Sequence, residues 1–273
     1  KLSDTAIVFL TRAAGENQDA STAKGEYYLS EAEEALIAKV TDTFAKTIVI
    51  LNVGYPIDVT FAEKYAVAGL IYSGFGGMLA GPALLDILSG AVNPSGKLPD
   101  TWAKDYFDIP SSKNFYDCVD KTRLTADENI YVDTCYEEDI YVGYRYFETF
   151  AKDKVKYPFG FGLSYTKFQT EILGFSVQGM AVTAVAKVTN VGGVSGRETV
   201  QLYLEAPQGK LGKPLRQLAA FAKTEELKPG ETEELLLKTE LTEYASYDDS
   251  GVTGHKSCYV LEEGDYIFYA GTD

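Results

Sequence analysis

The sequence predicts an α/β sandwich, with a parallel-type sheet flanked by helices, followed by an all-β sandwich. Two observations carry this prediction. In the first third of the chain, short apolar runs alternate with segments of helical periodicity, which is typical of βαβ units and a parallel sheet. From about Phe168 the apolar residues alternate with a period of two between regularly spaced turns, and this favours an antiparallel sandwich.

Three apolar runs are the predicted strands of the parallel sheet. They span Asp4–Leu10, Thr47–Val53 and Val67–Tyr72. The first is nearly continuously apolar, so we expect this strand to be buried on both faces.

A helix is predicted between the first two strands. Ser30 and Glu33 have the spacing of a capping box, in which each side chain satisfies a backbone amide at the start of a helix. Apolar residues then recur at helical spacing, and the helix is expected to continue through Lys46. These apolar residues are Leu36, Val40 and Phe44.

In the middle of the chain, the sequence predicts secondary structure less strongly. Short helices are expected from Pro56 to about Tyr65 and over Gly81–Leu88. No periodicity is visible from Ala103 to about Glu138, which predicts a long surface excursion. The Tyr-rich segment Ile140–Phe147 is expected to be extended.

The second half carries the strands of the predicted antiparallel sandwich. Turn signals at Asn190–Gly193 and Lys228–Glu231 separate them. The strands are expected around Val182–Val188, Val200–Leu204, Glu234–Leu237 and Tyr266–Ala270.

Composition narrows the classes of function. Of 273 residues, 45% are hydrophobic, enough for a core in each of two modest domains. The formal net charge of −15 disfavours nucleic acids and anionic membranes as partners, whereas a neutral substrate is indifferent to it. No run of about 18 apolar residues predicts a membrane span. The segment Lys1–Asp4 lacks the layout of a signal peptide. The location is therefore left open, with the cytoplasm slightly favoured.

Cysteine and histidine offer little for a metal site or a triad. The cysteines are Cys118, Cys135 and Cys258, an odd number without close pairs. A bridge between Cys118 and Cys135 stays open, although such sparse usage favours free thiols. His255 is the single histidine and lies in a polar, Gly-rich stretch, where an exposed surface position is expected.

The strand ends are the predicted place for chemistry, because ligands of parallel sheets bind beyond the carboxyl ends of the strands. The loop after the first strand carries Arg12, Glu16 and Asp19 on small residues. The other two strands end in Asn52–Gly54 and Ser73–Gly77, and all three loops should lie along one edge of the sheet. From spacing alone, a solvated polar loop is an equally good interpretation.

Two glycine-rich motifs fail as nucleotide sites. Gly90–Lys97 has five residues between its glycines and lacks the hydroxyl after the lysine that a P-loop uses for Mg²⁺. In Gly74–Leu79, Leu79 occupies the place of the third small residue of a dinucleotide fingerprint. A nucleotide-dependent α/β enzyme is therefore a weak alternative.

The order of motifs nevertheless resembles glycoside hydrolase family 3. Its α/β sandwich domain carries the same landmarks in the same order. These are Arg-x-x-Gly-Glu-x-x-Asp from Arg12, then Tyr28–Ser30, ILNVG, LIYSG, VNPSGKLPDTW, Tyr136–Tyr146 and Tyr157–Thr166. The stretches Val188–Gly192, Gln201–Tyr203 and Lys213–Leu218 are similar to the fibronectin type III-like domain of its β-glucosidases.

The resemblance implies two domains, one over residues 1–165 and one over residues 166–273. The first would be the family's α/β sandwich domain with its N-terminal part missing, and the second its fibronectin type III-like domain. Members with three domains also carry a (β/α)₈ barrel, which this chain lacks.

The resemblance also implies a retaining β-glycosidase, most simply a β-glucosidase. In this family the nucleophile is an aspartate of the barrel, and the acid/base lies on the sandwich domain at the position of Glu16. Arg12 and Asp19 match the flanking arginine and aspartate and are expected to bind substrate. Asn17 and Gln18 replace the usual glycine and aromatic residue, and Met78-Leu79 replaces a common Gln-Glu pair, which puts fine substrate contacts in doubt.

The expected partners are a β-linked glucoside or oligosaccharide and the barrel of the parent enzyme. No cofactor, metal, nucleic acid or membrane is expected, and the chain alone should be inactive. The alternative is a non-catalytic carbohydrate-binding or structural module.

Overall fold

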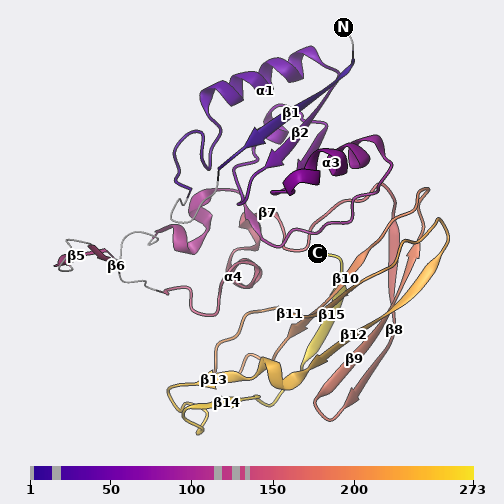
Figure 1. Cartoon of the computed structure of the whole chain (residues 1–273). Coiled ribbons are helices and arrows are strands. Elements are labelled where there is room, and N and C mark those ends of the chain that lie inside the picture. The colour runs from indigo at the N-terminus through magenta and orange to yellow at the C-terminus, as the bar shows by residue number, and fades with distance from the viewer. Residues whose placement is uncertain (1–2, 14–19, 114–118, 125–129, 133–135) are drawn as a thin grey trace. The chain divides into compact units, whose positions relative to one another are not determined.

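The computed structural model describes residues 3–13, 20–113, 119–124, 130–132 and 136–273 (Figure 1). By its internal contacts the chain divides into two compact units. Unit 1 comprises residues 1–92 and 103–113, and unit 2 comprises residues 93–102 and 114–273. The domain boundary expected at residue 165 stays a prediction, since contacts assign residues 93–102 and 114–165 to the unit that holds the sandwich.

Unit 1 contains the predicted parallel sheet, with strand order β1-β2-β3 (Figure 1). The strands are β1 (Thr5–Thr11), β2 (Lys46–Asn52) and β3 (Gly69–Tyr72). The central strand is the best buried, because Val49, Ile50 and Leu51 are inaccessible to solvent. This arrangement confirms the βαβ interpretation of the first third of the chain.

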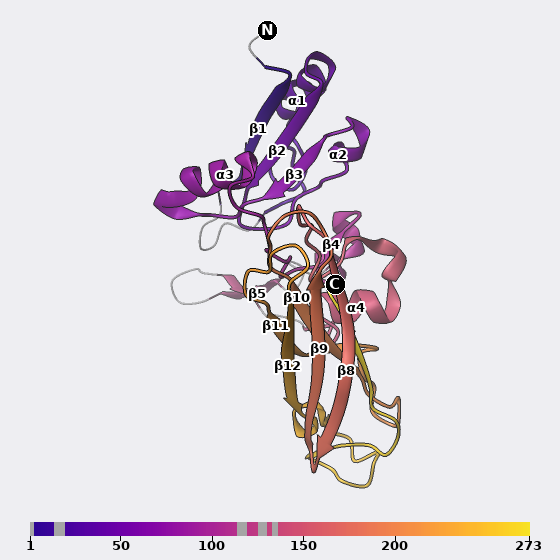
Figure 2. The ribbon, with the colours of Figure 1, turned by 90° about the vertical axis from the view of Figure 1, so that its right-hand side faces the viewer.

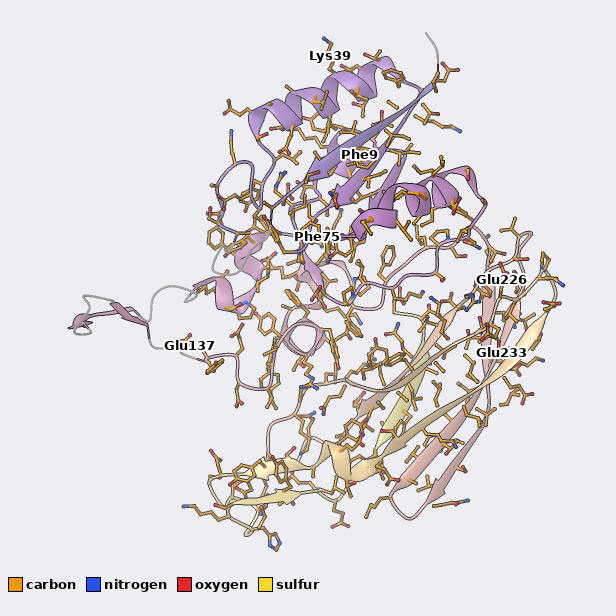
Figure 3. All side chains as sticks on the ribbon, viewed as in Figure 1. Phe9, Lys39, Phe75, Glu137, Glu226 and Glu233 are labelled. Atoms are coloured by element: carbon orange, nitrogen blue, oxygen red, sulfur yellow. The ribbon has the colours of Figure 1, made fainter. Side chains whose placement is uncertain are left out.

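The expectation that the first strand is buried on both faces is wrong. Val8 and Leu10 are buried, but Ile7 is exposed and Phe9, labelled in Figure 3, is 58% exposed. Successive side chains of a strand point to opposite faces, so this alternation shows that β1 is covered on one face only.

The capping box is confirmed. Ser30 caps α1 (Glu31–Thr43) by accepting from the Glu33 amide, and the Glu33 carboxylate accepts from the Ser30 amide. The helix ends before Lys46, which already belongs to β2. Ile37 is its buried residue, whereas Leu36 is exposed, so the apolar spacing alone misplaced the inner face.

The other helices of unit 1 are short. The stretch expected from Pro56 is helical only in α2 (Phe61–Lys64), because the Asp58 carboxylate turns the preceding segment by accepting from the Thr60 amide. The expected helix over 81–88 is confirmed as α3 (Ala80–Ser89), which follows a 3-10 turn, η1 (Gly77–Leu79). Three further short elements follow α3 in the chain: β4 (Trp102–Ala103), η2 (Tyr106–Asp108) and η3 (Pro110–Lys113).

In unit 2, the segment expected to be extended over Ile140–Phe147 is partly helical, which corrects the prediction. The helix is α4 (Tyr144–Phe150). Aromatic residues favour strands intrinsically, but here tertiary packing decides. Phe147 is buried, the Tyr144 ring stacks on Phe159 at 4.8 Å, and the Tyr144 hydroxyl accepts from the Leu218 amide.

Short strands and one turn lie on either side of α4 in the chain. They are β5 (Val119–Leu124), β6 (Ile130–Val132), η4 (Lys152–Lys154) and β7 (Val155–Tyr157). The hairpin of β5 and β6 lies inside the excursion predicted over 103–138.

The predicted antiparallel sandwich is confirmed as two three-stranded sheets, β12-β9-β8 and β11-β10-β15 (Figure 2). The core between them includes Val188, Leu202 and Leu237. The strands are β8 (Phe168–Gln178), β9 (Ala181–Asn190), β10 (Thr199–Glu205), β11 (Gln217–Lys223), β12 (Thr232–Glu240) and β15 (Ile267–Gly271). After a 3-10 turn, η5 (Leu241–Tyr244), a hairpin is inserted between β12 and β15, formed by β13 (Ser246–Asp248) and β14 (Cys258–Val260).

Landmark residues of the sequence form hydrogen bonds within unit 2. The fully buried Asn190 accepts from the Thr166 hydroxyl at 2.7 Å and donates to the Leu227 carbonyl at 2.8 Å. Asn93 of the NPSG turn donates to the Ser195 carbonyl. These bonds explain why residues 93–102 belong to the same unit as the sandwich.

Close backbone approach explains two glycines in these signatures. A Cβ on Gly162 would lie 2.2 Å from the Gly96 carbonyl oxygen, and one on Gly160 would lie 2.4 Å from the Gln201 side chain. The Gly96 oxygen belongs to the backbone, so packing excludes a side chain at Gly162, whereas Gly160 is also favoured by its φ of +83°.

Candidate functional site

The three strand-end loops of unit 1 meet at one edge of the sheet, as predicted for their described residues. The Arg12 amide donates to the Asn52 carbonyl at 3.3 Å, and the Ser73 amide and hydroxyl both donate to the Leu51 carbonyl. The second and third loops approach closely, because a Cβ on Gly54 would lie 2.5 Å from the Phe75 ring.

Arg12 is the functional candidate that the structure describes, and it is only 4% exposed. Its Nε donates to the Glu26 carbonyl at 2.7 Å and its Nη1 to the Thr11 carbonyl at 3.0 Å. Nη1 and Nη2 also donate to the two carboxylate oxygens of Glu33, at 2.6 and 3.0 Å. Among the described residues, these hydrogen bonds use four of the five guanidinium N–H groups.

Glu33 therefore caps the start of α1 and also pairs with Arg12. Its Oε2 accepts from the amide and hydroxyl of Ser30 as well as from Arg12. Burial alone would raise the pKa of Glu33, but the hydrogen bonds from Arg12 and Ser30 hold that pKa below its ordinary value. The carboxylate is thus kept charged opposite the buried guanidinium.

The segment that returns from the first loop is also fixed in place. The Glu26 carboxylate accepts from the Ser21 amide at 2.6 Å, and the Asp58 amide donates to the Tyr27 carbonyl at 2.9 Å. Tyr27 is buried, and burial raises the pKa of its hydroxyl, so this side chain stays neutral. The loop that carries the predicted acid/base is consequently anchored at both of its described ends.

Glu16 and Asp19 lie outside the described residues, as do Cys118 and Cys135. The predicted roles of Glu16 and Asp19 are therefore argued from the described scaffold on either side of them.

The third loop, which the sequence placed at this edge, adds an apolar turn that continues into Met78 and Leu79. Phe75, labelled in Figure 3, and Leu79 are exposed, and Met78 is 99% exposed. Gly77 has a φ of +65°, a conformation that suits glycine and brings these side chains onto one tight turn. The signal was present as three large apolar residues in a glycine-rich loop.

The residues that were not predicted to carry chemistry either hold the fold together or lie exposed on the surface. Lys97 of the false P-loop pairs with Glu198 at 3.0 Å and donates to the Gly162 carbonyl. Gly90 of the same motif ends α3 in the left-handed conformation. His255 is exposed, as expected, and Cys258 is an exposed free thiol.

Among the described residues, no group of three or more His, Cys, Asp or Glu side chains is arranged to hold a metal ion. Within the same part of the chain, no helix has the length and apolar character needed to cross a membrane.

The fold defines a class of protein: an α/β domain whose strand-end loops meet at one edge of a parallel sheet, together with an antiparallel sandwich of the fibronectin type. The chain belongs to glycoside hydrolase family 3. Residues 1–165 match the family model of the Glycosyl hydrolase family 3 C-terminal domain, and residues 198–273 match that of the Fibronectin type III-like domain. This membership confirms the resemblance found in the sequence.

Similar proteins carry β-glucosidase names. A β-glucosidase of Ruminococcus albus is 47% identical over 272 residues, which is 99% of this chain and 27% of that protein. A β-glucosidase structure from Paenibacillus barengoltzii superposes with a TM-score of 0.91 at 46% identity, over 99% of this chain and 29% of that one. The structure of β-glucosidase 3B from Thermotoga neapolitana in complex with α-D-glucose superposes with a TM-score of 0.87 at 38% identity. The match covers 98% of this chain and 36% of that one. The chain thus spans roughly a quarter to a third of these relatives.

Proposed function

We propose that this chain is part of a retaining β-glucosidase and supplies the general acid/base of the reaction. The observation that carries the proposal is the 47% identity to the Ruminococcus albus β-glucosidase over nearly the whole chain. The substrate would be a β-linked glucoside or oligosaccharide. The remaining part of the active site would come from a (β/α)₈ barrel elsewhere in the parent protein.

In this proposal Glu16 protonates the glycosidic oxygen as the bond to the leaving group breaks. A carboxylate on the barrel attacks the anomeric carbon from the opposite face, and Glu16 then activates the water that hydrolyses the glycosyl-enzyme. The two carboxyl groups of such an enzyme are about 5–5.5 Å apart, which requires the loop bearing Glu16 to be held firmly.

Arg12 is proposed to act on Glu16 by positioning its loop. Arg12 precedes Glu16 by four residues, and the described contacts of Arg12 fix the start of that loop to the helix cap at Glu33 and to the returning segment at Glu26. Because contacts with described residues already use four of its five N–H groups, we propose that Arg12 positions the loop more than it binds the substrate, the role expected from the resemblance. Asp19 remains the proposed substrate-binding carboxylate of the same loop.

Asp19 is poorly suited to be the nucleophile, so the chain alone is proposed to be inactive. It lies only three residues from Glu16 in the same loop and would approach the sugar from the same side. A nucleophile must attack the face opposite the departing oxygen.

Hydrolysis of a panel of aryl β-glycosides tests the function. The full-length parent should release phenol from aryl β-glucosides, and the 273-residue chain should not. If the parent hydrolyses none of the panel, the alternative of a non-catalytic module holds. Sustained release of phenol by the 273-residue chain, abolished by Glu16→Ala, would place both catalytic carboxylates in this chain. That result would contradict the proposal that the nucleophile lies on the barrel.

A further inference from the structure

The glycine-rich turn after β3 presents three large apolar side chains to the outside of unit 1. Phe75, labelled in Figure 3, and Leu79 are exposed, and Met78 is almost completely exposed. Charged residues make up 24% of the chain, yet none occurs from Ser73 to Leu85. Depletion of charge together with exposed aromatic and methionine side chains is typical of protein interfaces.

The start of the turn is fixed to the sheet. The amide and hydroxyl of Ser73 donate to the Leu51 carbonyl at 3.0 and 3.1 Å, which ties the turn to β2. The Phe75 ring lies against Gly54, because a Cβ on Gly54 would come within 2.5 Å of it. The apolar side chains are therefore presented by a backbone that is held in place from the second loop and from β2.

The turn lies at the edge of the sheet that faces the barrel under the proposed function. It follows β3, whereas the loop that holds Glu16 follows β1, two strands away in the order β1-β2-β3. Neighbouring strands are about 4.8 Å apart, so the two loops begin roughly 10 Å from one another. Glu16 would have to come within about 5–5.5 Å of the nucleophile on the barrel.

The usual area of a domain interface brings the turn into this contact. Interfaces between domains of one chain bury about 600–1,500 Å². A patch of that size around the loop of Glu16 reaches a turn that begins roughly 10 Å away. The turn thus shares its edge with the one loop of this chain that the proposed reaction requires to meet the barrel.

The chemistry of the turn favours an apolar protein surface over a sugar. The side chains of Met78 and Leu79 have no hydrogen-bond donor to offer to sugar hydroxyls. Methionine is flexible and adapts to irregular apolar surfaces, which suits a protein partner. These two residues also stand where the family commonly has a Gln-Glu pair, so an apolar contact here would be particular to this chain and its barrel.

We propose that Phe75, Met78 and Leu79 dock against an apolar patch on the parent's (β/α)₈ barrel and hold the edge that carries Glu16 against it. This inference rests on the proposed function, which assigns the rest of the active site to the barrel. It adds the surface through which the two domains meet.

Oxidation by dilute hydrogen peroxide tests the docking, because the chain has 2 methionines. Met78 is the probe, and the half-exposed Met180, between β8 and β9, is the internal reference. Peptide mass spectrometry gives the rate of sulfoxide formation at each residue in the 273-residue chain and in the full-length parent, both without substrate. Oxidation follows exposure, so the ratio of the Met78 rate to the Met180 rate should fall at least about tenfold in the parent.

Photo-crosslinking identifies the occupant. Photo-methionine, a diazirine analogue, is incorporated in place of methionine in the parent and activated by light. Links formed from position 78 should fall in peptides of the barrel of the same molecule, and mass spectrometry of the digested protein identifies them.

Three results would overturn the proposal. The first is an equal ratio of the Met78 and Met180 rates in the parent and in the 273-residue chain. The second is protection of Met78 that appears only with an aryl 1-thio-β-D-glucoside, which resists hydrolysis, because this would assign the turn to the substrate's aglycone. The third is a set of links from position 78 confined to peptides outside the barrel or to a second copy of the protein.

Hydrolysis of an aryl β-glucoside by the same parent sample separates docking from catalysis. A protected Met78 linked to the barrel in an inactive parent would support the docking and remove the catalytic proposal. An accessible Met78 in an active parent would remove the docking and leave the catalytic proposal in place.

Discussion

Arg12 and Glu33 form a two-point ion pair, with hydrogen bonds of 2.6 and 3.0 Å, that joins the end of β1 to the first turn of α1. The same carboxylate completes the capping box with Ser30. A residue four positions before the proposed acid/base, Glu16, is thus held by the helix cap of its own unit. This ion pair therefore fixes the start of the loop that follows β1.

Arg12→Lys should destabilise unit 1 by about 1–3 kcal/mol, because lysine cannot make the two-point contact and leaves Glu33 incompletely paired. Chemical denaturation of the 273-residue chain measures this. The matched control is Arg197→Lys. Arg197 pairs with Glu225 at an exposed position, so this substitution should leave the free energy of unfolding almost unchanged. Equal effects of the two variants would contradict the account of Arg12.

Arg12→Lys should also affect catalysis in the full-length parent. If Arg12 positions the loop of the acid/base, kcat/KM should fall more for glucosides with poor leaving groups than for activated ones. Poor leaving groups need protonation, whereas activated ones do not. A purely structural role would lower the active fraction and reduce both rates equally.

Gly162→Ala should destabilise unit 2 by about 1–3 kcal/mol, the usual cost of overpacking. Its Cβ would lie 2.2 Å from the Gly96 carbonyl oxygen, so the backbone of the NPSG turn would have to move. Gly96→Ala is the matched control, because no atom lies within 4 Å of the Cβ it would add. Thermal unfolding of both variants checks the prediction, which fails if Gly162→Ala is as well tolerated as Gly96→Ala.

The Asp248 carboxylate should make the β13–β14 hairpin sensitive to acid. The hydroxyl of Thr253, with the amides of Thr253 and Gly251 and the Ser250 hydroxyl, holds the pKa of Asp248 well below its ordinary value. A lowered pKa contributes stability that is fully present above the unfolded pKa of about 3.9 and is lost as the pH falls through the folded value.

The slope of stability against pH measures this contribution. Asp248→Asn should flatten the loss of stability below about pH 4, and Asp249→Asn, at the exposed neighbouring position, should not. Identical acid profiles for the wild type and Asp248→Asn would show that the carboxylate is not linked to folding.

Much of the fold was predictable because local signals agreed with tertiary structure. The buried run around Val49–Leu51 and the capping box at Ser30 and Glu33 are strong signals, and both are confirmed. The helix α4 was missed because Tyr144 and Phe147 favour strands by propensity, while contacts with Phe159 and Leu218, distant in sequence, stabilise the helix.

The site was predictable in its location and less so in its contacts. Strand ends gave the edge of the sheet, but spacing could not reveal that Arg12 turns inward to Glu33, twenty-one residues away.

The central claim is that Glu16 is the acid/base of the parent enzyme, and azide rescue of Glu16→Ala tests it most directly. The variant should lose about 10²–10⁴-fold in turnover of glucosides with poor leaving groups. With an activated aryl β-glucoside the glycosyl-enzyme should still form, and added azide should intercept it without a general base, raising turnover and yielding β-glucosyl azide. Near wild-type turnover, or a turnover that azide neither raises nor diverts to the glycosyl azide, would contradict the assignment.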